Sequence, residues 1–210
     1  MRAIILVDIQ NDFLQNGALE VPDGEAIIPI VNQLQPLFDL VVMTQDWHPA
    51  DHGSFAPNHP GLRPYDVVNL NGLQQVLWPT HCVQNSPGAE FSMALDIRNV
   101  DKIFQKGTDP GIDSYSGFFD NGRRKATGMG DYLHEKGVTS VYVCGLATDY
   151  CVKFTALDAL SLGFETFLIE DASRGVNVNR GDVKKAVAEM KAAGIAIMKS
   201  KEILKPVRVR

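Results

Sequence analysis

Short, wholly apolar runs alternate along this chain with segments in which apolar residues recur at helical spacing. Runs of this kind are typical of strands in a parallel sheet, where helices bury both faces and no polar alternation is needed. We therefore predict six strands, at Ala3–Val7, Leu40–Thr44, Lys102–Gln105, Ser140–Cys144, Glu165–Ile169 and Ile195–Met198.

The segments between these strands carry apolar residues three and four positions apart, which predicts amphipathic helices. The predicted helices span residues 27–38, 130–137, 151–162 and 183–194. Asn179 is the expected N-cap of the last helix and Gly194 its stop. Alternating strands and helices indicate an α/β fold with three layers, α/β/α, around a mainly parallel sheet of about six strands.

One region, residues 46–98, departs from this alternation because it has few strand signals and many Pro, Gly, Asn and His residues. An irregular insertion of this length is usually functional, as a lid or a pocket wall. The sequence contains no internal repeat and no shift in composition that would mark a boundary between domains. We expect residues 1–210 to form one domain that carries this metal- and pocket-forming insertion at about 46–98.

Composition narrows the class of protein further. The 210 residues are 45% hydrophobic and 21% charged, with a net charge of −5, which argues against disorder and gives no reason to expect a nucleic-acid partner. Three cysteines form no disulfide framework and suggest a reducing compartment. Because no apolar run approaches the roughly 20 residues of a membrane span, we expect a cytoplasmic protein without a membrane partner.

Chemically reactive side chains follow several predicted strands, at the edge where open parallel sheets bind ligands. Asp8 follows the first strand, Lys106 the third, and Cys151 opens a helix after a glycine-bearing turn. A helix N-terminus lowers a thiol pKa, and its free N–H groups can hold an oxyanion. Each residue alone also fits a structural role, as a capping carboxylate, a surface lysine and a buried thiol. Together they are a base, a cation and a nucleophile.

A second group of residues has the chemistry of a metal site. Asp46 and His48 are two positions apart, so their side chains point the same way in an extended chain. A carboxylate with imidazoles suits zinc or another divalent transition metal. His81 and His52 are the candidate further ligands, and ordinary loop polar residues are the alternative interpretation.

Aromatic residues in polar or glycine-rich loops could form the walls around a small flat ligand. Phe13, Trp78 and Tyr115 have this setting, whereas Phe104 and Phe154 are expected in the core.

Five separated motifs resemble those of the nicotinamidases, a branch of the isochorismatase-like cysteine hydrolases. They are Asp8–Phe13, Asp46–Pro49, Trp78–Val83, Lys106–Gly107 and Gly145–Val152. The resemblance covers essentially the whole chain and implies the isochorismatase-like hydrolase fold. It also implies hydrolysis of nicotinamide to nicotinate and ammonia in NAD salvage, through a cysteine thioester, with pyrazinamide as a further substrate.

By motif position, the resemblance implies that Cys151 is the nucleophile, Asp8 the general base and acid, and Lys106 the third catalytic residue. It implies one divalent metal ion, zinc, iron or manganese, on Asp46, His48 and His81, with His52 left open as a fourth ligand. The implied substrate-binding residues are Phe13, Trp78, Tyr115, Leu146 and Ala147. The implied oxyanion hole consists of the N–H groups of Ala147 and Cys151, next to a cis peptide bond between Leu146 and Ala147.

Other functions stay open at this point. A metal-free amidohydrolase of the same superfamily, with an N-carbamoyl or ureido substrate, would share the catalytic triad. Hydrolysis by a metal-bound hydroxide would not need the Cys151 thiol. A binding module without enzyme activity would need neither the hydroxide nor the thiol. Family members occur as monomers, dimers and larger assemblies, so a homo-oligomer is also left open.

Overall fold

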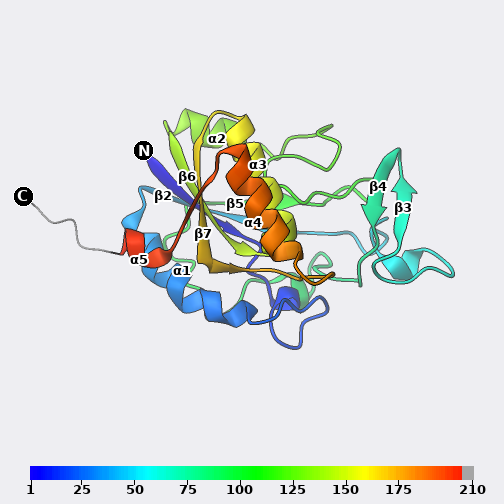
Figure 1. The fold of residues 1–210 in the computed structure, drawn as a ribbon. Helices are drawn as coiled ribbons and strands as arrows, with labels where there is room; N and C mark the ends of the chain where they lie inside the picture. Colours follow the sequence, from blue (N-terminus) through cyan, green and yellow to red (C-terminus); the bar gives the residue numbers. More distant parts are fainter. Residues whose placement is uncertain (205–210) are drawn as a thin grey trace, which may run out of the picture.

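The central sheet is the framework of the fold. In the computed structural model, which describes residues 1–204, six parallel strands lie in the order β5-β2-β1-β6-β7-β8 (Figure 1). They are β1 (Arg2–Val7), β2 (Leu40–Asp46), β5 (Lys102–Lys106), β6 (Ser140–Leu146), β7 (Glu165–Arg174) and β8 (Ala196–Met198). The six predicted strands are confirmed, and β7 continues beyond its predicted end to Arg174.

The two hydrophobic cores follow from the alternation of side chains along each strand. On β1, Ala3, Ile5 and Val7 belong to one core and Ile4 and Leu6 to the other, and all five side chains are fully buried. Successive side chains of a strand point to opposite faces, so an apolar run fills both cores only if both faces are covered.

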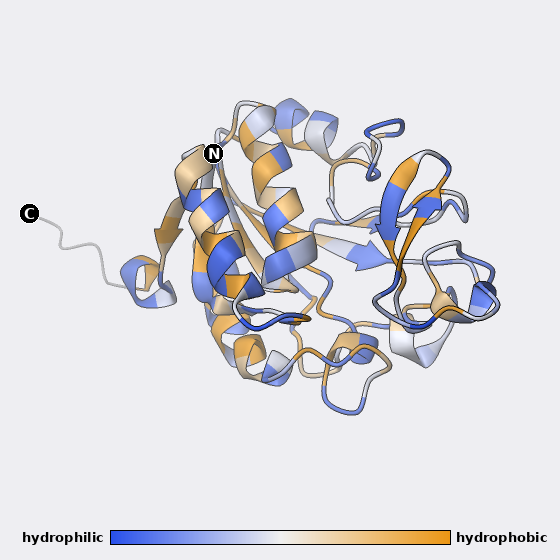
Figure 2. Cartoon of the chain, turned by 45° about the vertical axis from the view of Figure 1, so that its right-hand side comes forward, coloured by the Kyte–Doolittle hydropathy of each residue, from blue (hydrophilic) through white to orange (hydrophobic). Residues whose placement is uncertain are grey.

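Helices cover both faces of the sheet, which confirms the three-layer α/β/α architecture (Figures 1 and 2). One face packs against α1 (Ile28–Leu34) and α5 (Ser200–Ile203). The other face packs against α2 (Met129–Glu135), α3 (Lys153–Ser161) and α4 (Asp182–Ala193). Within residues 1–204, no helix combines the length and the apolar character needed to cross a membrane.

The ends of α4 test the capping predictions. Gly194 has a φ of 109° at the C-cap, as its predicted stop requires. The prediction that Asn179 is the N-cap is wrong, because Gly181 occupies that position and the Asn179 amides donate to Asp182 Oδ2 instead. Asn177 takes over part of the capping, since its Oδ1 accepts a hydrogen bond from the Val183 N–H over 3.1 Å.

The irregular insertion contains an unpredicted hairpin, β3 (Val67–Leu70) and β4 (Leu73–Val76). Its two-residue turn is Asn71-Gly72, with φ angles of 48° and 90°, the left-handed pair that a tight hairpin turn requires. The hairpin stands off the sheet, on the side where the insertion loops lie (Figure 1). It brings part of the insertion toward the carboxyl ends of the strands.

Candidate active site

Four neighbouring strands deliver the reactive side chains to one point. Asp8 follows β1, Asp46 ends β2, Lys106 ends β5, and Cys151 lies in the turn after β6. Asp46 pairs directly with Lys106 across the sheet. Because the four strands are adjacent and parallel, their carboxyl ends lie at the same edge, as the sequence predicts.

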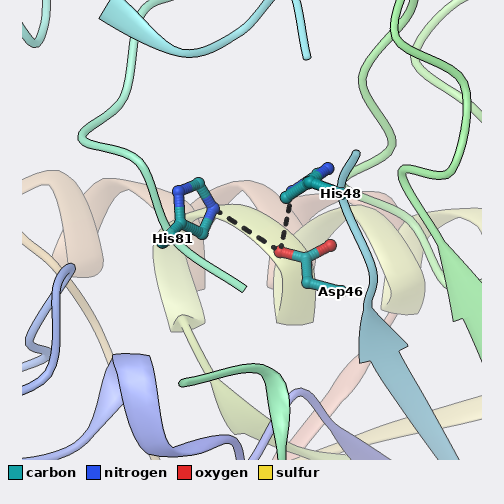
Figure 3. Close-up of side chains that lie close together, drawn as sticks. All are labelled: Asp46, His48 and His81. Carbon is teal, nitrogen blue, oxygen red and sulfur yellow. Dashed lines mark ion pairs between the residues drawn. The ribbon is translucent and has the colours of Figure 1, made fainter. Parts of the chain in front are cut away.

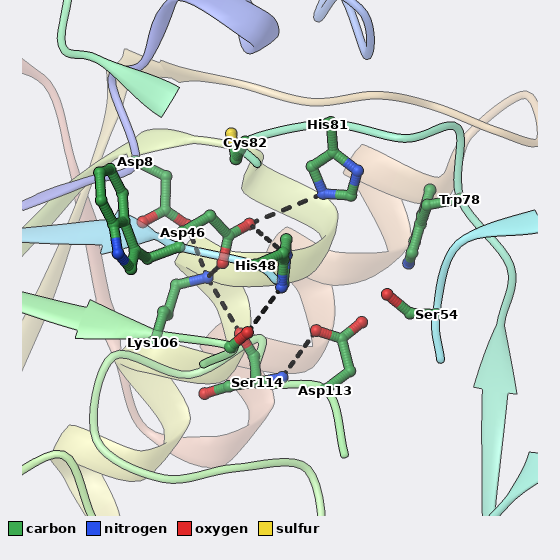
Figure 4. Close-up of polar contacts among 12 residues, drawn as sticks. Asp8, Asp46, His48, Ser54, Trp78, His81, Cys82, Lys106, Asp113 and Ser114 are labelled. Carbon is green, nitrogen blue, oxygen red and sulfur yellow. Dashed lines mark hydrogen bonds and ion pairs between the residues drawn. The ribbon is translucent and has the colours of Figure 1, made fainter. Parts of the chain in front are cut away.

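The Lys106 ammonium group lies between the carboxylates of Asp8 and Asp46 (Figure 4) and also reaches Cys151. Nζ lies 2.8 Å from Asp8 Oδ2 and donates to Asp46 Oδ1 over 2.5 Å. It also lies 3.4 Å from Cys151 Sγ and donates to the Ser114 carbonyl over 3.0 Å. Each of the four charged or nucleophilic side chains is buried, so solvent screens these interactions little.

Burial and charge together set the protonation states of this cluster. Burial raises the pKa of Asp8 to about 6 although Lys106 lowers it. Burial alone would lower the pKa of Lys106, but Asp46 and Asp8 hold it well above its usual value. Burial likewise raises the pKa of the Cys151 thiol, against the lowering by Lys106. The lowered thiol pKa expected from a helix N-terminus is therefore not found, and the resting thiol needs a base.

The turn that carries the thiol differs slightly from the predicted helix start. Thr148–Val152 forms a π-helical turn that contains Cys151, and α3 begins only at Lys153. Gly145 precedes this turn with a φ of 123°, and a Cβ there would lie 2.2 Å from the Val7 carbonyl oxygen. Only glycine therefore lets β6 pass this close to β1.

An N–H group beside the thiol is free to bind a ligand. The Leu146–Ala147 peptide bond is cis, as the resemblance implies. The Ala147 N–H donates no hydrogen bond to any residue between 1 and 204. An unpaired N–H next to a nucleophile can bind an oxyanion.

The second predicted group, Asp46, His48 and His81, also comes together (Figure 3). Asp46 Oδ2 lies 3.6 Å from His48 Nε2 and 3.8 Å from His81 Nε2. Ligands bound tetrahedrally at about 2.1 Å from an ion stand roughly 3.4 Å apart, close to these separations.

The other ring nitrogen of each histidine is already engaged. His48 Nδ1 lies 2.8 Å from the Gly107 carbonyl and His81 Nδ1 lies 2.7 Å from the Pro79 carbonyl. Donation to a carbonyl fixes the tautomer that leaves Nε2 as a metal ligand. The donor set and its outer partners therefore fit a divalent transition metal.

His52 belongs to a different grouping. Its ring centroid is 4.3 Å from that of His48, and its Nδ1 lies 2.7 Å from Ser54 Oγ. A ring nitrogen of His52 lies close to potential ligand atoms of His48 and Asp113. It does not belong to the group formed by Asp46, His48 and His81. His52 Nε2 is buried and has no partner in the described part of the chain.

A cavity lies between the Cys151 thiol and the metal-type residues Asp46, His48 and His81, all of which line it. Phe13, Trp78, Tyr115 and Ala147 line it, as the sequence predicts for the substrate site. Leu146 does not line it, because its side chain is 1% exposed and packs in the core under α1. The lining residues that sequence reasoning missed are Leu19, Asp113, Tyr150 and Val176.

A buried polar residue of the hairpin, Gln75, holds the aromatic side chain of Tyr115 in place at the cavity. Gln75 Nε2 donates to Tyr115 Oη over 3.0 Å and to Asp113 Oδ2 over 2.9 Å. Trp78 Nε1 also donates to Tyr115 Oη, over 3.2 Å. The hairpin therefore orients two walls of the cavity, and the Asn71-Gly72 turn was the signal that could have revealed it.

Two further aromatic predictions have different outcomes. Phe104 is 4% exposed and lies in the core, as expected. The core prediction for Phe154 is wrong, because this side chain is 39% exposed. It lies in the first turn of α3 and stacks on Tyr115 with ring centroids 5.4 Å apart. Phe154 therefore backs the cavity wall from outside.

Comparison with known proteins agrees with this arrangement. The model of the isochorismatase domain family matches residues 2–202. The nicotinamidase of Escherichia coli K12 is 49% identical over 200 residues, which are 93% of this chain and 93% of that protein.

Two solved structures are similar in fold as well as in sequence. A nicotinamidase/pyrazinamidase of Acinetobacter baumanii superposes with a TM-score of 0.94 at 45% identity, covering 97% of this chain and 98% of the other. The Pyrococcus horikoshii pyrazinamidase in complex with zinc has a TM-score of 0.77 at 42% identity, covering 94% and 98%. The chain thus belongs to the isochorismatase domain family, and within it to the nicotinamidase branch.

Proposed function

We propose that this protein hydrolyses nicotinamide to nicotinate and ammonia, with pyrazinamide as a second substrate. The observation that carries the proposal is the Lys106 ammonium group, which touches both Asp8 and Cys151 next to a cavity with aromatic walls. The E. coli and A. baumanii relatives, named as nicotinamidases, support the choice of substrate.

In the proposed reaction, Asp8 takes the proton of Cys151 and the sulfur attacks the carboxamide carbon. The N–H groups of Ala147 and Cys151 bind the oxyanion. Asp8 then gives its proton to the leaving nitrogen, so that ammonia departs and a thioester remains. Asp8 next removes a proton from water, whose oxygen attacks the thioester carbon. The sulfur leaves with the electrons of the C–S bond and takes this proton back from Asp8, which restores the thiol, and the acid product ionises to nicotinate. The Asp8 pKa of about 6 suits both proton transfers near neutral pH.

Asp46, His48 and His81 would hold one divalent metal ion, for which we propose zinc because a zinc-bound pyrazinamidase is among the similar structures. When bound, the ion supplies a Lewis acid for the substrate's ring nitrogen. Phe13, Trp78 and Tyr115 would clamp the ring, so that its carboxamide meets the thiol.

Ammonia release from a panel of amides tests the proposal, measured with and without a chelator. We expect release from nicotinamide and pyrazinamide that falls sharply when the metal is removed. Release from N-carbamoyl or ureido compounds alone, with no metal dependence, would favour the other branch of the superfamily.

The variant Cys151→Ala separates the thiol mechanism from hydrolysis by a metal-bound hydroxide. We expect it to lose turnover by a factor of about 10⁴ or more while zinc content and nicotinate binding stay near those of the parent protein. Robust residual hydrolysis would eliminate the thioester route.

A further inference from the structure

Thr44, on β2, touches the proposed proton carrier directly. Its Oγ1 donates a hydrogen bond to Asp8 Oδ1 over 2.6 Å, and both side chains are fully buried. Sheet register builds this contact, because Thr44 pairs with Val7, the residue that precedes Asp8. Asp8 has a φ of 48°, a left-handed conformation that a non-glycine residue keeps only when its surroundings impose it.

The two oxygens of Asp8 have different surroundings. Oδ1 accepts the hydrogen bond from the Thr44 hydroxyl. An ionised carboxylate has no proton to give, so the hydroxyl must be the donor in this pair. Oδ2 lies 2.8 Å from Lys106 Nζ but accepts no well-oriented hydrogen bond from the residues the structure describes. A lone pair therefore stays available on Oδ2, the oxygen that shares Lys106 with Cys151 Sγ.

The orientation of Thr44 is itself constrained. A Cβ added to Gly117 would approach Thr44 Cγ2 to 2.5 Å, so the threonine methyl lies tightly against the glycine backbone. Gly117 is held in turn by hydrogen bonds with Thr155 Oγ1 (2.9 Å) and Thr127 Oγ1 (2.6 Å). Since threonine is stiff at χ1, a seated methyl keeps its hydroxyl directed at Asp8.

We propose that Thr44 is a positioning residue for proton transfer, whose hydroxyl occupies Asp8 Oδ1 and so reserves Oδ2 for the catalytic proton. This inference rests on the proposed function. The S–H bond of Cys151 breaks as an Oδ2–H bond forms, and the sulfur keeps the electron pair that attacks carbon. The Oδ2–H bond then breaks as its proton passes to the leaving nitrogen, which departs with the electrons of the C–N bond.

Two substitutions separate the hydroxyl from the methyl group. Thr44→Val keeps the shape and removes the donor, whereas Thr44→Ser keeps the donor and removes the methyl. For zinc-loaded Thr44→Val we expect kcat for nicotinamide to fall about 10- to 100-fold with KM within about twofold, as misplacement of a reacting group predicts. Thr44→Ser should stay within about threefold of the parent kcat.

Alkylation of Cys151 by iodoacetamide at fixed pH, without nicotinamide, supplies a readout that needs no turnover. Alkylation requires removal of the thiol proton. It should be slower in Thr44→Val than in the parent and unchanged in Thr44→Ser. If the valine variant does not fold, Thr44→Ala takes its place and should behave as valine is expected to.

Two results would overturn the inference: parent-like kcat and alkylation without the hydroxyl, or a loss in Thr44→Ser as large as in Thr44→Val. The second result would make methyl packing the cause. A parent protein that releases no ammonia would refute the proposed function instead, while the alkylation rates would still report on the Thr44–Asp8–Cys151 link.

Discussion

Replacing Lys106 by methionine removes a positive charge that lies between two buried carboxylates, those of Asp8 and Asp46. The ammonium nitrogen lies 2.8 Å from Asp8 Oδ2 and 2.5 Å from Asp46 Oδ1, and the side chains of Lys106 and Asp8 are 0% exposed. Methionine has a similar length and is flexible, so the change in packing is small. The expected loss of stability is therefore mainly electrostatic.

The size of the stability loss depends on how far the charges of Asp8 and Asp46 are still compensated once the ammonium group is gone. Removing one partner of a buried ion pair costs about 3–5 kcal/mol, because the remaining charge has no compensation. A metal ion on Asp46 would offset the loss there, and Asp8 can take up a proton, so we expect the lower value of about 3 kcal/mol near pH 7. For a chain of this size, that corresponds to a fall in Tm of roughly 6–12 °C.

The sign of the pH dependence is a further check. Burial raises the folded-state pKa of Asp8 to about 6, above its ordinary value of 3.8, and losing Lys106 removes a lowering influence and raises this pKa further. Because the pKa of Asp8 is higher in the folded state, the folded protein binds a proton more readily than the unfolded chain. The ionised Asp8 therefore destabilises the fold at a pH above its folded-state pKa, and this loss of stability shrinks as the pH falls toward the pKa of the unfolded chain. Lys106→Met should therefore lose less stability at acidic pH than near pH 7.

Urea unfolding of the zinc-loaded parent, Lys106→Met, Asp8→Asn and the double variant measures these effects as a double-mutant cycle. Neutralising Asp8 should restore part of the stability that Lys106→Met loses, which appears as a coupling of more than about 1 kcal/mol. A Lys106→Met protein within about 1 kcal/mol of the parent, or additive effects in the cycle, would refute the electrostatic reasoning.

Two further predictions concern turnover. Because burial raises the pKa of Asp8 to about 6 and only its ionised form can accept the thiol proton, kcat/KM should decline as the pH falls through that value. Ammonia release measured across this range checks the decline, and a rate that stays flat well below pH 6 would contradict the role of Asp8. Gln75→Leu removes the donor to Tyr115 and Asp113, so KM for nicotinamide should rise about 10-fold with the Cys151 alkylation rate unchanged. A parent-like KM would show that the cavity wall does not depend on Gln75.

The sheet was predictable from the sequence because its strands are buried on both faces. Ala3–Val7 is wholly apolar, and the structure divides its side chains between the two cores. The same reasoning located the candidate site, since Asp8 directly follows β1 and Lys106 is the last residue of β5, and the carboxyl ends of these strands lie at one edge. The residues at the carboxyl ends of parallel strands can thus be assigned to one site even when the order of the strands is unknown.

The hairpin and the polar contacts were harder to predict, for different reasons. β3 and β4 are short and half exposed, so they lack an apolar run, and Asn71-Gly72 alone marks them. Gln75 and Thr44 look like ordinary polar residues until the fold buries them against Tyr115 and Asp8. The core prediction for Phe154 failed because a residue in the first turn of a helix can also lie at the surface, where Phe154 stacks on Tyr115.

The strand order has a consequence for the chain while it is being synthesised. Residues 1–106 contain β1, β2 and β5, which form one half of the sheet, but β6 comes only at Ser140. Until β6 is made, β1 is an edge strand, although it is one of the most apolar strands in the finished protein. Open apolar edges invite pairing with other chains. A ribosome that stalls between β5 and β6 would therefore leave an aggregation-prone intermediate that holds the acid and the lysine but lacks the thiol.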